Sequence, residues 1–120
     1  MGAQTRRTST TAQDRATKIR ELNDRLRTGH RGGRMLITPG ILSLPPAVIE
    51  SVMLAVREFD AFAVDTDPYG EHDFGSVEID GNRVFWKIDY FDPTLTAGSD
   101  DPADDSLTVR VMAVMLADEH

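Results

Sequence analysis

The stretch that decides the fold is residues 74–91, FGSVEIDGNRVFWKIDYF. Two runs of alternating apolar and polar residues flank Asp80-Gly81, a dipeptide typical of a tight hairpin because both central turn residues need a positive φ. The register that this turn predicts pairs Ile79 with Asn82, Val77 with Val84, and Gly75 with Trp86. Glu78 then lies opposite Arg83, and an opposite-charge pair across two strands supports this register.

The flanking sequence supplies elements that can cover the apolar face of the hairpin. Residues 107–116 predict a third strand, and its second half is apolar at successive positions, as in strands that are covered on both sides. Residues 12–28 carry apolar side chains at helical spacing after a threonine cap, and residues 45–59 repeat this pattern after two prolines. Residues 35–37 form a short apolar run that is either an edge strand or an extended segment.

Together these elements predict an α+β domain with two N-terminal helices on one face of an antiparallel sheet of three or four strands, a β-meander. The length of 120 residues allows one domain, which we place at residues 12–118 behind a flexible basic tail at residues 1–11. The sequence contains neither an apolar leader nor a membrane-spanning run, so we expect a cytoplasmic protein that does not bind membranes. The absence of cysteine excludes disulfides and cysteine-ligated metals.

The net charge of -7 conceals an uneven distribution along the chain. Residues 1–34 hold nine basic and three acidic side chains, a balance of +6, whereas residues 35–120 carry -13. One interpretation is that the basic helix lies against the acidic body of its own chain, and the other is a basic arm that binds phosphate. We favour the first, because the whole protein repels nucleic acid at long range. Nucleic acid would be bound only through residues 1–34.

A candidate functional loop lies before the hairpin and concentrates polar side chains in nine residues: Asp65, Asp67, Tyr69, Glu71, His72 and Asp73. The hairpin register places Asp73 beside Ile88, and this brings a second polar set close to the loop. That set holds the candidate partner-binding residues Lys87, Asp89, Asp92, Asp100, Asp101 and Asp104, together with Ser99 and Asp105. We therefore expect the two acidic stretches to form one patch.

Three interpretations of this loop remain open. It could hold Mg, Mn or Ca through oxygen ligands, with His72 as a nitrogen donor and carboxylates drawn from Asp65, Asp67, Asp73 and Asp89. Glu71, His72 and Asp73 could instead act as general acids and bases. The third interpretation is structural, because Asp side chains cap turns and Pro68 and Gly70 shape the bend. For a loop rich in Asp, Pro and Gly, this third interpretation is the ordinary expectation.

Three segments carry a resemblance to a known family: DPYGEHDFG at 67–75, FWKIDYFD at 85–92 and GSDDPAD at 98–104. The chain resembles a small bacterial family known only as a domain of unknown function, over about residues 19–118. The resemblance implies that members are often carried on plasmids and other mobile elements. It implies no activity, cofactor or catalytic residue.

Our first hypothesis for the function is a small acidic interaction or regulatory protein without catalytic activity. Its acidic patch would bind a basic surface of a host protein, in an inhibitory or anti-defence role suggested by the mobile-element resemblance. The alternative is a divalent-metal-dependent enzyme, similar to a phosphoester hydrolase, built on the loop at 65–73. We expect either no cofactor or one divalent cation. The apolar second helix and the two-sided third strand leave room for a dimer.

Overall fold

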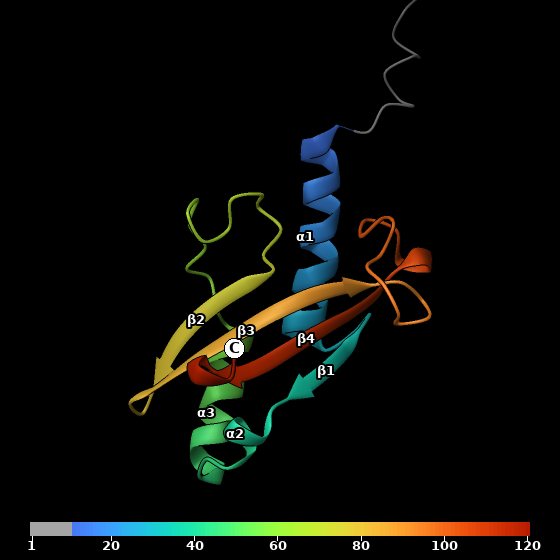
Figure 1. The fold of residues 1–120 in the computed structure, drawn as a ribbon. Coiled ribbons are helices and arrows are strands. Elements are labelled where there is room, and N and C mark those ends of the chain that lie inside the picture. Colours follow the sequence, from blue (N-terminus) through green and yellow to red (C-terminus); the bar gives the residue numbers. More distant parts are fainter. Residues whose placement is uncertain (1–10) are drawn as a thin grey trace, which may run out of the picture.

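A computed structural model describes residues 11–120 as one mixed sheet with helices on one of its faces (Figure 1). The tail expected at residues 1–11 lies outside the described residues, except for Thr11. The elements in chain order are α1 (Ala12–Gly29), β1 (Arg34–Ile37), α2 (Pro39–Leu42), α3 (Pro46–Arg57), β2 (Phe74–Ile79), β3 (Asn82–Phe91), the 3₁₀ turn η2 (Asp105–Leu107), β4 (Val109–Leu116) and the 3₁₀ turn η3 (Ala117–Glu119). The α+β class and the N-terminal position of the helices are confirmed.

The hairpin of β2 and β3 has the register that the sequence predicts. Ile79 pairs with Asn82, Val77 with Val84, and Gly75 with Trp86. Asp80 and Gly81 both adopt positive φ, at 53° and 79°. The Arg83 guanidinium lies 3.6 Å from the Glu78 carboxylate.

The sheet is mixed, so the prediction of a purely antiparallel meander is wrong. The strand order is β1-β4-β3-β2, and β1 runs parallel to β4, with Met35 opposite Met112. The reason is the connection through α3, which leads from β1 at one edge to β2 at the other. Such a strand–helix–strand crossover keeps the two edge strands parallel, and β4, two strands from β2, has the same direction. A local hydrophobic pattern does not specify which neighbour an edge strand meets.

Helices α1 and α3 pack on the same face of the sheet, which we call the inner face (Figure 1). The residues of the core on this face are Leu26, Ile41, Val52, Val56, Val84, Trp86, Ile88, Met112 and Val114. Trp86 is fully buried at its centre and meets the ring of Phe59 edge-on, with 5.5 Å between centroids. The opposite face is called the outer face below.

The helix boundaries follow from local capping. Thr11 caps α1, because its Oγ1 accepts a hydrogen bond from the Asp14 N–H at 2.9 Å and the Asp14 carboxylate accepts one from the Thr11 N–H. The short helix α2 was not predicted, and Thr38 is its N-cap residue. Strand β4 begins two residues later than predicted, because η2 takes up its expected start. No helix within residues 11–120 is long and apolar enough to span a membrane.

Candidate functional site

Helix α1 lies between the two acidic stretches of the chain. We call residues 58–73 the first acidic loop and residues 92–108 the second; Figure 1 shows them on the left and right of α1. Arg20 donates a hydrogen bond to the Gly70 carbonyl in the first loop, and Arg15 pairs with Asp101 in the second. At about 100° per residue, positions 15 and 20 project from nearly opposite flanks of the helix. The prediction that the two acidic loops form one patch is therefore wrong, whereas the predicted position of Asp73 beside Ile88 is confirmed by the hydrogen bond from the Ile88 N–H to the Asp73 carbonyl at 2.8 Å.

The second acidic loop is tied to the arginines of α1. The Arg15 guanidinium lies 2.7 Å from the Asp101 carboxylate, and Arg25 lies 2.7 Å from Asp105. The hydrogen bond from Arg15 lowers the pKa of Asp101 below its ordinary value. The interpretation that the basic helix lies against its own acidic body is confirmed.

Other carboxylates of the second loop accept hydrogen bonds from groups within the same loop. Asp92 accepts hydrogen bonds from the Thr96 N–H and the Thr94 hydroxyl, and these bonds lower its pKa. Asp104 accepts from both the N–H and the hydroxyl of Ser106. Asp100 is exposed, and among the described residues it forms no ion pair. Most of the negative charge in this loop is thus engaged within the chain.

Arg110, which was not predicted as a site residue, is fully buried on β4. Its Nε donates to Asn23 Oδ1 at 3.0 Å, its Nη1 to Asp105 at 2.7 Å, and its Nη2 to the Pro102 carbonyl. Burial lowers the pKa of Arg110 below its ordinary value. Its position in the strand could have indicated this burial. Residues 110, 112 and 114 share one face of β4, and the last two belong to the core.

Asn23, also fully buried, carries this network from Arg110 to the first acidic loop. Its Nδ2 donates to the Glu71 carbonyl at 3.0 Å and to the Tyr90 hydroxyl at 2.8 Å. The Tyr90 hydroxyl in turn donates to Glu71 Oε1 at 2.9 Å. Burial is the main cause that raises the pKa of Tyr90, so this phenol stays a donor to Glu71. Glu71 is thereby held in one place.

Asp67 and His72 shape the first acidic loop. The Asp67 side chain is almost fully buried, and its Oδ1 accepts the N–H groups of both Glu71 and His72 at 3.1 Å. His72 has a positive φ of 56°, and its ring stacks on Phe62 with 3.6 Å between centroids. His72 Nδ1 lies 2.9 Å from the Asp24 carboxylate on α1. These contacts fit the structural interpretation of both residues.

The residues expected to bind a metal do not converge. Among the described residues no group of three or more His, Asp or Glu side chains is arranged to hold an ion. Asp67 is occupied by backbone N–H groups, His72 faces Asp24, and Asp89 pairs with Lys87 at 3.2 Å on the outer face. Within residues 11–120, the charged and aromatic partners of His72 are Asp24, Asp67 and Phe62, and none of them is a hydroxyl or thiol nucleophile.

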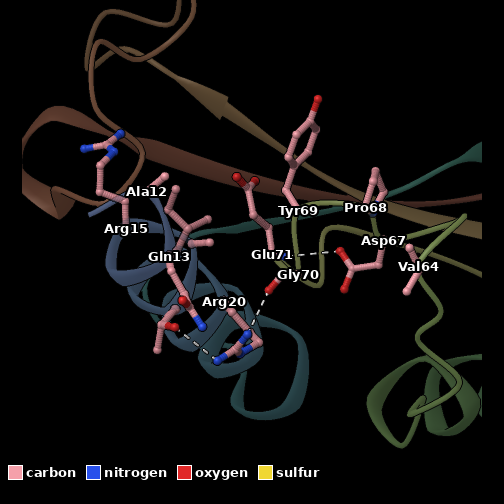
Figure 2. A pocket seen from close by; sticks show the side chains of 13 residues that line it. Ala12, Gln13, Arg15, Arg20, Val64, Asp67, Pro68, Tyr69, Gly70 and Glu71 are labelled. Carbon is pink, nitrogen blue, oxygen red and sulfur yellow. Dashed lines mark hydrogen bonds between the residues drawn. The ribbon is translucent and has the colours of Figure 1, made fainter. Parts of the chain in front are cut away.

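A groove separates the first half of α1 from residues 64–71 and has a volume of about 870 Å³ (Figure 2). Two large side chains on its rim are exposed, Val64 at 84% and Tyr69 at 76%. Figure 2 shows Glu71 and Tyr69 rising on the same side of the loop, while Arg20 reaches across to the Gly70 carbonyl. Tyr69 and Glu71 were predicted as site residues; Val64 and the α1 wall were not.

In the described residues, the carboxylates of the first acidic loop are held by hydrogen bonds rather than by arginines or lysines. Within residues 11–120, neither Asp67, Glu71 nor Asp73 forms an ion pair with a lysine or arginine. Burial, followed by the nearby Glu71 carboxylate, raises the pKa of Asp73 above its ordinary value. The groove therefore combines an exposed aromatic ring and apolar surface with the carboxylates of Asp67 and Glu71, and Arg15 and Arg20 line its α1 wall.

No curated protein and no solved structure matches the chain. Residues 37–119 match a protein family, and this range runs from the end of β1 to the end of η3. The loop wall of the groove lies inside the matched range, and the α1 wall lies outside it. The chain belongs to the family described as "Protein of unknown function (DUF3768)".

Proposed function

We propose that this protein is a binding protein without catalytic activity, which takes a basic segment of a partner protein into the groove beside α1. The observation that carries the proposal is the contrast between the two acidic loops. Arginines of the same chain neutralise Asp101 and Asp105, whereas Asp67, Glu71 and Asp73 have no such partner among the described residues. A basic partner supplies a cation to Glu71 and Asp73, because Arg20 on this side of α1 is directed to the Gly70 carbonyl and not to a carboxylate.

The rim of the groove suits an arginine-rich or lysine-rich segment. Tyr69 offers an exposed ring to a cation, and interactions of this kind contribute about 0.5–1 kcal/mol at exposed sites. Glu71 has one carboxylate oxygen bound to Tyr90 and its second available to a partner. Asp65 is exposed next to Val64 and adds negative charge at the entrance. The net charge of -7 accelerates the approach of a basic partner.

We further propose that this binding inhibits or regulates the partner protein. An inhibitory or regulatory protein, acting in the cytoplasm on a basic surface of a host protein, fits an acidic chain of this size. The family resemblance connects such a role to mobile elements.

A labelled peptide of nine arginines tests the proposal by fluorescence anisotropy. We expect Glu71→Gln and Asp65→Asn each to weaken binding by up to about fivefold, because exposed charge pairs contribute about 0.2–1 kcal/mol. Glutamine keeps an oxygen that can accept the Tyr90 hydrogen bond. The matched control is Asp80→Asn, which removes the same charge at the hairpin turn, where asparagine tolerates the positive φ. Equal weakening by the control would show that only the total charge matters, and the proposal would fail.

A further inference from the structure

The outer face of the sheet has no helix over it in the described part of the chain. Helices α1 and α3 both pack on the inner face, through residues such as Leu26 and Val56 (Figure 1). The outward positions are the alternate ones, and along the central strand β4 they are Val109, Val111, Ala113 and Met115. All four are apolar. An antiparallel strand that faces water on one side alternates apolar with polar residues, so this pattern is typical of a strand covered on both faces.

The apolar surface continues beyond β4. Phe85 lies beside Met115 in the register of β3 and β4, and Leu36 lies beside Ala113 in the register of β1 and β4. Leu36 is 50% exposed. The C-terminal His120 covers one end of the face, because its ring lies 5.5 Å from that of Phe85. Met115 and Ala113 are already buried within the chain, at 5% and 9% exposure, so the apolar side chain most open to a partner is Leu36, with Val109 and Val111 partly exposed.

The charges on the outer face differ from those of the rest of the molecule. The chain has 20 acidic and 13 basic side chains, yet the outward positions hold three bases, Arg34, Arg83 and Lys87, and two acids, Glu78 and Asp89. Lys87 and Asp89 form an ion pair at 3.2 Å. Two copies with a charge of -7 each repel one another when acidic surfaces meet. This face is where they can approach without that repulsion.

We infer that the outer face is the contact between two copies of this chain, related by a two-fold axis. In such a contact the same patch meets itself, so it must be self-complementary. A patch that carries both signs around an apolar centre meets this condition, since Lys87 of one copy can pair with Asp89 of the other. A basic partner fits this face less well, because its three bases outnumber its two acids. The contact leaves the groove beside α1 free, since the groove lies on the inner side.

Sedimentation equilibrium of the full chain tests the inference. We expect a particle of twice the 13.3 kDa chain mass, and Leu36→Asp should raise the dissociation constant at least tenfold. The control is Leu42→Asp, which places the same charge at a 61% exposed leucine on α2, away from the outer face. The dimer should persist in 1 M NaCl, because salt screens the repulsion between the acidic copies. A monomer at every concentration up to about 0.5 mM, or a dimer unaffected by Leu36→Asp, would overturn the inference.

The absence of cysteine allows a second measurement, by disulfide cross-linking. Lys87→Cys places one thiol near the middle of the outer face, whereas Asp100→Cys places one in the second acidic loop. Mild oxidation should link the Lys87→Cys chains into disulfide dimers much faster than the Asp100→Cys chains. Equal rates of linkage would contradict a contact at this face. Circular dichroism of each variant confirms that the comparison is made on folded protein.

Discussion

At the scale of single residues, the molecule contains a carboxylate whose charge opposes folding. Asp73 is half-buried near three other carboxylates, and its pKa is raised mainly by burial and next by Glu71. Because the pKa in the folded state lies above that of the unfolded state, Asp73 favours folding at low pH. This contribution is lost as the pH rises through the folded-state pKa. At neutral pH the ionised group therefore costs stability.

Replacing Asp73 by asparagine should raise the free energy of unfolding at pH 7. The gain should vanish at about pH 3, where the aspartate is largely protonated in both states. Urea denaturation at the two pH values measures this, with Asp65→Asn as the control at an exposed position in the same loop. A stabilisation of equal size at both pH values would show that charge is not its cause.

Asn23 is a polar side chain of α1 whose loss should be costly. It makes three hydrogen bonds, with Glu71, Tyr90 and Arg110, and is fully buried. Asn23→Ala leaves the buried Arg110 Nε and the Glu71 carbonyl without their partner, so we expect a loss of about 2–4 kcal/mol in urea denaturation. Ser51→Ala, which removes one exposed hydrogen bond, should change stability by less than about 0.5 kcal/mol. Similar losses for the two variants would mean that the network contributes little.

At the scale of elements, the packing of β2 against β3 depends on the missing side chain of Gly75. A Cβ at this position would lie against the buried indole of Trp86, which has no space to move. We expect Gly75→Ala to cost about 2 kcal/mol, as is usual when a core is overpacked. Gly98→Ala is the control, since a Cβ there meets only the Tyr90 carbonyl at an ordinary contact distance of 3.8 Å. If both variants melt at the same temperature, the indole is not confined as described.

The C-terminal turn η3 is joined to α2 by Glu119. Its carboxylate accepts hydrogen bonds from the Thr38 hydroxyl at 2.6 Å, the Leu116 N–H at 2.8 Å and the Gly40 N–H at 2.9 Å. The bond from Thr38, followed by that from Leu116, lowers the pKa of Glu119. A lowered folded-state pKa means that this carboxylate stabilises the fold above its ordinary pKa, and that the contribution is lost as the pH falls.

Glu119→Gln should therefore lower the melting temperature at pH 7, with a difference that shrinks as the pH falls below about 4. Thermal melts across this range measure the effect. Asp118→Asn, at the exposed neighbouring position, should show no such pH-dependent difference. A difference for Glu119→Gln that stays constant down to about pH 3 would rule out ionisation of Glu119 as its source.

The elements differ in how far the sequence predicts them. The hairpin register follows from Asp80-Gly81, because a two-residue turn leaves one pairing, and the structure confirms it. Capping by Thr11 is equally local. The parallel direction of β1 was not predictable in this way, because it depends on where α3 crosses the sheet. Arg110 was hidden for a similar reason, since a buried arginine needs Asn23 and Asp105 from distant parts of the chain.

At the scale of the whole molecule, the position of α1 decides which acidic surface is available. Counting charges predicted that the basic helix would lie against the acidic body, and this is confirmed. The number of charges in each segment could not predict that the helix would lie between the two acidic loops and neutralise mainly one of them. That outcome depends on the opposite flanks from which Arg15 and Arg20 project. The candidate residues of the first loop, such as Glu71, therefore remain available, and those of the second loop, such as Asp101, are engaged.

Chemical-shift mapping by NMR tests this division most directly. The nine-arginine peptide is titrated into the ¹⁵N-labelled protein, and the amide signals are followed. We expect the largest shifts at residues 64–73 and in the first two turns of α1, with small shifts at residues 100–105. Largest shifts at residues 100–105, with residues 64–73 unaffected, would contradict it.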